Sequence, residues 1–190
     1  STFAEVEDAV AVLESEGFPK CLLTVMQCTS EYPAPTDQAN LNAMVSFRDI
    51  LGTQIGFSDH TLGYQVAVIA SALGASVIEK HITLDTALPG PDHAASLEPV
   101  AFAEMVNAIR NVKPTIGSGE KIVTRSEAKN RDLIRKSIVA LVPIDAGEVF
   151  SQNNLGLMRP GTGLSPMAWN DILGTVANRD YEQHEMIEPS

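Results

Sequence analysis

Two histidines stand where a divalent metal could be held. His60 follows a strand-like run in the segment GFSDHT, and His81 lies within another run in VIEKHIT. If both strands belong to one parallel sheet, the two side chains lie at carboxyl-terminal strand ends, the edge that holds the active site in α/β barrels. Paired imidazoles with carboxylates nearby suit Mn²⁺, Zn²⁺ or a similar ion, whereas a histidine can equally be a hydrogen-bonded core residue. The residue types alone leave both interpretations open.

Carboxylates flank both histidines. Asp59 precedes His60, and Glu79 lies two residues before His81. Either acid could accept a hydrogen bond from a ligand imidazole and so fix its orientation. Residues two apart on a strand share a face, so we expect Glu79 and His81 to point the same way. The alternative is a salt bridge at the strand end.

Further polar side chains could hold an oxygen-rich substrate. Ser30 and Tyr32 follow the first strand-like run and, with Ser58, could bind phosphate or sugar oxygens or instead hydrogen-bond their own backbone. Asp92, in the loop GPDH, could accept hydrogen bonds from sugar hydroxyls or serve as a turn residue. Arg159 stands beside a glycine-rich turn and could donate in pairs to a carboxylate, although the residues alone favour a surface arginine.

Helix and strand patterns alternate through the first part of the chain. A capping box at Thr2 and Glu5 opens a helix that Gly17 ends. Apolar runs predict strands and helices in turn, with strands at 22–28, 53–57 and 77–83 and helices at 41–52, at 62–73 and from 98 onward. This order predicts a parallel sheet covered by helices. Three strands cannot close a barrel but could form the last part of an eight-stranded one, and a helix that opens at residue 2 suggests a piece of something longer.

The composition changes after Pro114. Gly, Ser, Lys and Arg dominate the following stretch, and short strand-like pieces then alternate with turn signals. We therefore expect residues 1–115 to belong to the α/β domain, 116–135 to form a linker, and 136–190 to form a small, mostly β domain. That domain is near the lower size limit for independent folding.

Charge and hydropathy exclude some functions. A formal net charge of −11 without a basic stripe argues against a nucleic acid or an anionic membrane as partner, though not against a small anionic substrate. The longest nearly apolar stretch, 66–78, is too short to span a bilayer, and no signal-peptide pattern opens the chain. Cys21 and Cys28 flank a strand and show no CxxC spacing, so we expect two reduced thiols in a cytoplasmic protein.

An ordered set of motifs resembles the sialic acid synthase family, which comprises N-acetylneuraminate synthase and its nine-carbon relatives such as the legionaminic acid synthases. The matching stretches lie between residues 28 and 167 and read CTSEYPAP, GFSDHTLG, ALGASVIEKHITLD, GPDHAASLEP, RKSIVA and RPGTGLSPM. The resemblance implies a TIM barrel followed by an antifreeze-like domain. It also implies condensation of phosphoenolpyruvate with N-acetylmannosamine, or a related acetamido sugar, with release of phosphate.

Matching positions carry implied roles. His60 and His81 correspond to the metal-binding histidines of the family, and Mn²⁺ is the implied ion, with Mg²⁺ or Co²⁺ possible. Asp92 corresponds to an acidic residue near the sugar, which makes it the third implied catalytic residue. The resemblance thus favours a metal site over two core histidines.

The remaining matches concern substrate binding and assembly. Tyr32 and Ser58 match substrate-contacting positions, and Ser30 stands where some members have asparagine. Arg159 resembles the arginine that the antifreeze-like domain extends into the barrel of the partner subunit, which implies a domain-swapped homodimer. The first five barrel strands of the family have no counterpart in this sequence. Those strands should supply the lysines that hold phosphate and the glutamates proposed for acid–base work. We therefore expect these 190 residues alone to be inactive.

Two other functions compete with the synthase. One is a non-catalytic carbohydrate-binding or ice-binding module, suggested by the antifreeze-like tail, although that tail lacks a repetitive threonine array. The other is a metal-dependent aldolase that uses pyruvate itself. Fold analogy alone would not separate the three, and phosphate release would.

Overall fold

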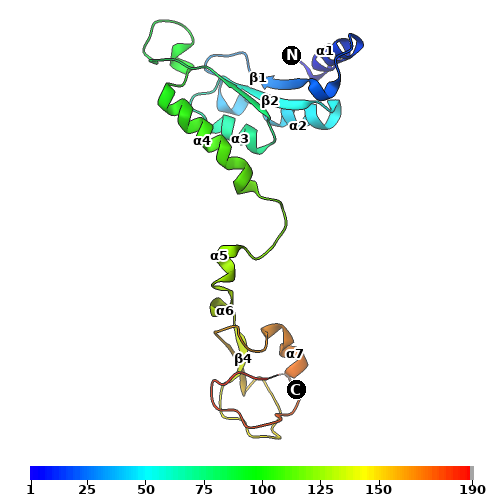
Figure 1. Ribbon diagram of the computed structural model, residues 1–190, viewed down its shortest axis with the longest axis vertical. Coiled ribbons are helices and arrows are strands. Elements are labelled where there is room, and N and C mark those ends of the chain that lie inside the picture. Colours follow the sequence, from blue (N-terminus) through cyan, green and yellow to red (C-terminus); the bar gives the residue numbers. More distant parts are fainter. Residues whose placement is uncertain (189–190) are drawn as a thin grey trace. The chain divides into compact units, whose positions relative to one another are not determined.

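The structure is a computed structural model and describes residues 1–188 of the chain. It consists of two compact units, Ser1–Glu120 and Lys121–Ser190 (Figure 1). Within the described residues, no helix is both long enough and apolar enough to cross a bilayer.

The first unit opens with helix α1, Phe3–Ser15. The Thr2 side chain accepts from the Glu5 amide while the Glu5 carboxylate accepts from the Thr2 amide, so the predicted capping box is confirmed. Gly17 follows the helix at φ +93°, a left-handed conformation that suits glycine at a helix end. Val10 of α1 and Phe47 belong to the same buried cluster.

Three parallel strands follow, which confirms the predicted sheet. They are β1 (Thr24–Cys28), β2 (Gln54–Asp59) and β3 (Val77–Lys80), in the order β1-β2-β3. The connecting helices are α2 (Asn42–Ser46), which continues as a π-helical turn at Phe47–Leu51, then α3 (Gln65–Ala72), and α4 (Pro99–Ile116) follows β3. Short 3₁₀ turns lie at Lys20–Leu22, Thr36–Gln38 and His93–Ala95.

The first and third strands are shorter than predicted for tertiary reasons, whereas β2 extends to Asp59, beyond the predicted end at 57. Leu22 belongs to a 3₁₀ turn, so β1 begins only at Thr24. His81, expected within the third strand, lies one residue beyond β3, because its carbonyl accepts from the Leu97 amide at 2.9 Å and no longer pairs with β2.

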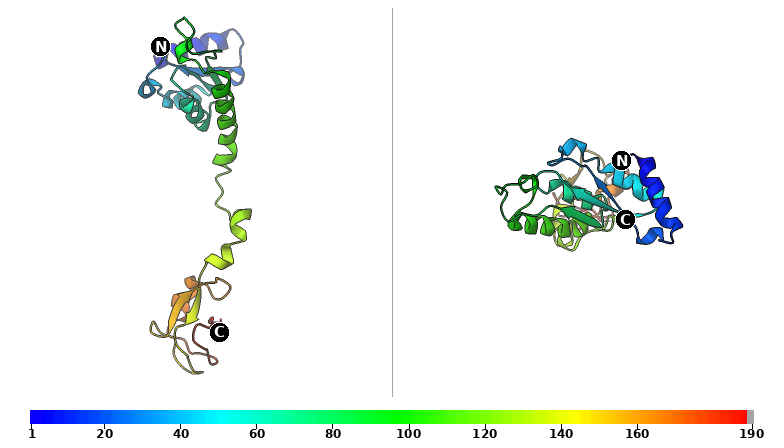
Figure 2. Two further views of the ribbon diagram at one scale, coloured as in Figure 1. Left: turned by 90° about the vertical axis from the view of Figure 1, so that its left-hand side faces the viewer. Right: turned by 90° about the horizontal axis from the view of Figure 1, so that it is seen from above.

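The two faces of the sheet differ in character. Ile55 and Phe57 of β2 point into a core that α1, α2 and α3 share, and α3 and α4 pack against each other beside it (Figure 2). Side chains alternate along a strand, so Gly56 faces the other way. A Cβ atom at that position would lie 2.9 Å from both the Met26 side chain and the Val77 carbonyl.

The second unit is small and built on short β segments. Its antiparallel strands β4 (Ser137–Ala140) and β5 (Leu155–Met158) pair Ser137 with Met158. Short helices lie at α5 (Arg125–Ala128), α6 (Arg131–Ile134) and α7 (Trp169–Ile172), with a 3₁₀ turn at Pro166–Ala168. Both α5 and α6 fall within the stretch predicted as linker, and α4 continues through Pro114, where we expected the composition to break.

A separate buried cluster holds the second unit together. Ile138, Ile144 and Leu155 are almost completely buried there. Trp169 packs against this cluster from its edge, as expected of a core tryptophan. His184, near the end of the described residues, is exposed.

Candidate active site

The pairing of β2 with β3 decides which side chains meet. Ser58 lies opposite Glu79 and Asp59 lies opposite Lys80. Because side chains alternate between faces, the Ser58–Glu79 pair and the Asp59–Lys80 pair project from opposite sides of the sheet. His60 lies two residues after Ser58, so we place its side chain on the same face as the Ser58–Glu79 pair.

His60, His81 and Tyr32 form one aromatic cluster at the carboxyl ends of the strands. The two imidazole centroids are 5.2 Å apart and nearly perpendicular. The Tyr32 ring lies 4.2 Å from the His60 ring and 5.4 Å from the His81 ring. His60 is buried, whereas the Tyr32 side chain is 46% exposed and so lies at the opening of the cluster.

Hydrogen bonding fixes the tautomer of His60. Its Nδ1 lies 2.8 Å from the Thr29 carbonyl oxygen. A carbonyl can only accept, so Nδ1 carries the proton and a neutral ring leaves a lone pair on Nε2. That Nε2 is 3.5 Å from the Ser58 hydroxyl, which itself donates to the Glu79 carboxylate at 2.6 Å. Because its proton is donated to Glu79, the Ser58 hydroxyl has none left for His60 Nε2, so the two side chains lie beside each other without a hydrogen bond.

Asp59 makes no hydrogen bond to the His60 ring, and its side chain takes part instead in the alternative, a strand-end salt bridge. Its Oδ1 accepts from the Thr61 amide at 2.9 Å and the Thr61 hydroxyl at 2.7 Å. Its Oδ2 is 3.2 Å from the Lys80 ammonium, and both side chains are 0% exposed. Within the described residues Asp59 Oδ2 has no hydrogen-bond partner, and the Lys80 ammonium donates to the Thr61 carbonyl. Burial lowers the pKa of Lys80, and the Asp59 charge opposes this shift.

The donor set fits an open metal site supplied by two imidazoles. The lone pair on His60 Nε2 is directed away from the backbone, and the His81 ring makes no hydrogen bond within residues 1–188. In the same part of the chain, no group of three or more histidine, cysteine or acidic side chains could hold an ion. An ion held by these two rings would keep several positions for water or substrate, as catalytic sites require.

Two predicted substrate residues lie outside this cluster. Ser30 is exposed and lines a cavity of about 360 Å³ beside Met26 and Cys28. Asp92 is exposed in the loop after β3, and its backbone carbonyl accepts from the Ser96 hydroxyl at 2.7 Å. No hydrogen bond or ion pair within residues 1–188 joins either of them to the histidines.

Arg159 belongs to a loop of the second unit that hydrogen bonds hold in place. Its Nε donates to the Ile134 carbonyl at 2.9 Å, and its side chain is otherwise exposed. The fully buried Ser137 hydroxyl donates to the Pro160 carbonyl at 2.7 Å and accepts from the Gly163 amide at 2.9 Å. This hydroxyl therefore fastens both sides of the turn that presents Arg159.

Replacing Ser137 by alanine should destabilise the second unit by about 1–3 kcal/mol, because the Pro160 carbonyl and the Gly163 amide both lose the buried hydroxyl that is their partner. The measurement is the thermal unfolding midpoint. Ser165→Ala is the control, since Ser165 also bonds a backbone amide but lies near the surface. Equal midpoints for the two variants would show that the Ser137 hydroxyl does not fasten the turn.

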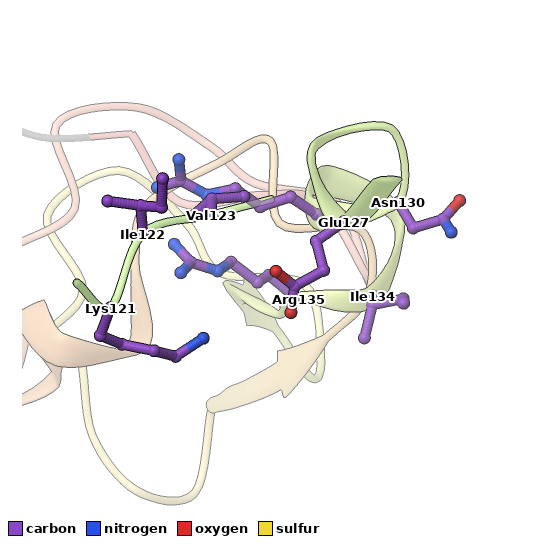
Figure 3. Close-up of a pocket in the computed structure, with 8 residues that line it drawn as sticks. Lys121, Ile122, Val123, Glu127, Asn130, Ile134 and Arg135 are labelled. Atoms are coloured by element: carbon purple, nitrogen blue, oxygen red, sulfur yellow. The ribbon is translucent and has the colours of Figure 1, made fainter. Parts of the chain in front are cut away.

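A pocket of about 490 Å³ lies apart from the histidines, in the second unit (Figure 3). Lys121, Arg131 and Arg135 line it together with apolar side chains such as Ile122 and Ile134. All of these residues are exposed. No hydrogen bond within the described residues ties 121–123 to α5 or α6, so the pocket has no fixed wall and we assign it no chemistry.

The chain thus combines a helix-covered parallel sheet, two histidines at neighbouring strand ends and a small β unit. Residues 1–121 match the NeuB family, and residues 135–190 match the SAF domain. The chain belongs to the NeuB family.

Named relatives agree with this membership. The N,N'-diacetyllegionaminic acid synthase of Campylobacter jejuni is 43% identical over 187 residues, which cover 98% of this chain and 56% of the relative. A pseudaminic acid synthase of the same species is 36% identical over 168 residues, covering 88% and 49%. The crystal structure of an N-acetylneuraminic acid (sialic acid) synthetase from Leptospira borgpetersenii has a TM-score of 0.60 at 32% identity, covering 68% and 45%. The chain spans about half the length of the curated relatives it matches.

Proposed function

We propose that this chain provides the metal-binding and sugar-binding part of a synthase. The complete enzyme condenses phosphoenolpyruvate with N-acetylmannosamine, or a related acetamido sugar, to give a nine-carbon sialic-acid-type sugar and phosphate. The observation that carries the proposal is the pair of imidazoles at neighbouring parallel strand ends, with the lone pair of His60 Nε2 freed by the Thr29 bond. Membership of a family whose named relatives are synthases of such sugars supports it.

The proposed architecture places the three strands last in an eight-stranded TIM barrel. Residues 1–115 form that part of the barrel, 116–135 the linker and 136–190 the antifreeze-like domain, consistent with a family match that changes between 121 and 135. The other strands supply the groups that hold phosphate and the acid–base glutamates. The chain alone is therefore inactive.

His60 and His81 hold a divalent ion, for which Mn²⁺ is our first choice and Mg²⁺ or Co²⁺ the alternatives. Such an ion, when bound, polarises the aldehyde oxygen of the sugar as a Lewis acid. Glu79 keeps Ser58 directed beside His60 through the 2.6 Å bond, and the Thr29 carbonyl keeps the His60 ring in its ligand tautomer.

The reaction forms one carbon–carbon bond and one carbon–oxygen bond from water, and it breaks the carbon–oxygen bond to phosphate. C3 of phosphoenolpyruvate attacks the aldehyde carbon, whose oxygen gains a proton. Water adds at C2, where positive charge develops, and gives up its two protons as phosphate leaves and C2 becomes a keto carbon. In this scheme the sugar is positioned by Tyr32, Asp92, Ser30 and Ser58. Holding the sugar in place lowers the entropic cost of bringing the two substrates together.

The partners follow from the same scheme. Arg159 reaches the active site of the other subunit in a domain-swapped homodimer and pairs with a substrate carboxylate. The enzyme works in the cytoplasm and uses neither a nucleic acid nor a membrane, in keeping with its net charge of −11.

Phosphate release tests this function. The complete enzyme with Mn²⁺, phosphoenolpyruvate and N-acetylmannosamine should release phosphate only when the sugar is present. Release with another acetamido sugar alone would change the substrate and keep the reaction. Product formation from pyruvate without phosphate release would identify the aldolase instead, and carbohydrate or ice binding without turnover would identify the binding module.

A further inference from the structure

The backbone pairing of β2 with β3 ends just before the two histidines. The paired register ends where Asp59 lies opposite Lys80. One residue later each strand turns to a different partner, since the Ala34 amide donates to the His60 carbonyl at 2.9 Å and the Leu97 amide donates to the His81 carbonyl at 2.9 Å. Within residues 1–188 the last β2–β3 backbone pair is that of the residues before the histidines, and no backbone hydrogen bond joins His60 to His81 directly.

Lys80 supplies the connection that the backbone lacks. Its ammonium lies 3.2 Å from Asp59 Oδ2 and donates to the Thr61 carbonyl. Asp59 and Thr61 are the residues immediately before and after His60, and they also bond each other through Asp59 Oδ1. One side chain of β3 thus holds His60 from both sides, on the face of the sheet opposite the imidazoles.

The burial of this pair makes the connection rigid. Both side chains are 0% exposed, so water neither screens the attraction nor replaces either partner. A buried ion pair contributes little net stability compared with apolar packing, and its best-supported roles concern structural specificity. Setting the geometry of His60 relative to His81 is a role of that kind.

We infer that Lys80, with Asp59 and Thr61, is a positioning residue that sets the separation and orientation of the two histidine rings. The inference rests on the proposed metal function, because that is the function for which ring separation matters. Lys80 does not touch substrate or metal; it acts through the backbone around His60. Loss of partners that orient metal ligands weakens metal binding by about 10–100-fold.

The test uses the complete enzyme with Asp59→Asn and Lys80→Met combined, so that no unpaired charge stays buried. Phe57→Leu is the control, because Phe57 is buried on the same face of β2 two residues earlier and its ring cannot form a hydrogen bond or ion pair with either partner. Mn²⁺ alone is titrated, with free Mn²⁺ followed by electron paramagnetic resonance. Imidazole ¹⁵N shifts of the metal-free proteins report ring position and tautomer without any metal. Melting temperatures measure the cost to the fold.

We expect the double variant to bind Mn²⁺ at least tenfold more weakly, with altered imidazole shifts, while Phe57→Leu lowers the melting temperature and changes neither. Unchanged affinity and shifts in the folded double variant would overturn the inference. If the double variant fails to fold, Thr61→Val, which removes only the hydroxyl bond to Asp59, gives the same readouts with the same meaning. If the wild type binds no Mn²⁺, the metal part of the proposed function fails, and the shifts alone support or overturn the positioning role.

Discussion

His81→Ala should abolish Mn²⁺ binding by the complete enzyme and reduce sugar-dependent phosphate release by about 10³-fold or more. The variant removes one of the two imidazoles that lie together at the strand ends. A bound divalent ion contributes several kcal/mol of transition-state charge stabilisation, and each 1.36 kcal/mol is a factor of ten in rate. The His81 ring makes no hydrogen bond within residues 1–188, so the fold should survive.

The control for this variant is another histidine. His184 is exposed and has φ +70°, a conformation that asparagine tolerates, so His184→Asn should change neither metal binding nor turnover. Phosphate release that His81→Ala leaves intact would remove His81 from the metal site while keeping the synthase. Loss of release with retained Mn²⁺ binding would instead assign His81 to the substrate.

Lys80→Met should destabilise the sheet by about 3–5 kcal/mol, because it leaves the Asp59 carboxylate buried without its cation. Adding Asp59→Asn should recover part of that loss, since the remaining amide is neutral. Hydrogen exchange of the β2 and β3 amides measures the effect locally, which matters in a chain of two units that need not unfold together.

The comparison of the two variants decides how the pair acts. A double variant as unstable as Lys80→Met would show that the unpaired charge is not the source of the loss. A single variant as stable as the wild type would mean that water reaches Asp59, contrary to its 0% exposure. Ile138→Val, in the core of the second unit, should leave exchange in β2 and β3 unchanged.

Local signals predicted the elements, and tertiary contacts set their ends. The capping box at Thr2, the helix-ending glycines at 17 and 52, and the alternation of strands with helices all follow from residue types and are present. The strand that should have contained His81 ends before it, because the Leu97 amide captures its carbonyl. No local pattern identifies such a distant partner.

The sequence predicted that the two histidines lie together, but not the contacts that the residues around them make. Neighbouring parallel strands bring His60 and His81 together, as their positions after two strand runs indicated. The partner of Asp59 depends on the register of β2 against β3, which a sequence does not contain. Lys80 was missed altogether, since lysine is almost never fully buried unless paired; the signal that could have found it is its place opposite Asp59, each one residue before a histidine.

Gly56 is a position at which this sequence has little freedom to evolve. It sits two residues before Ser58 on the histidine face, and one added methyl group would meet both a thioether side chain and a carbonyl of the next strand. Met26 could rotate aside, but the Val77 backbone could not move without shifting β3. We therefore expect neutral drift among descendants of this chain to spare position 56 while it alters exposed positions of the same strand such as Gln54.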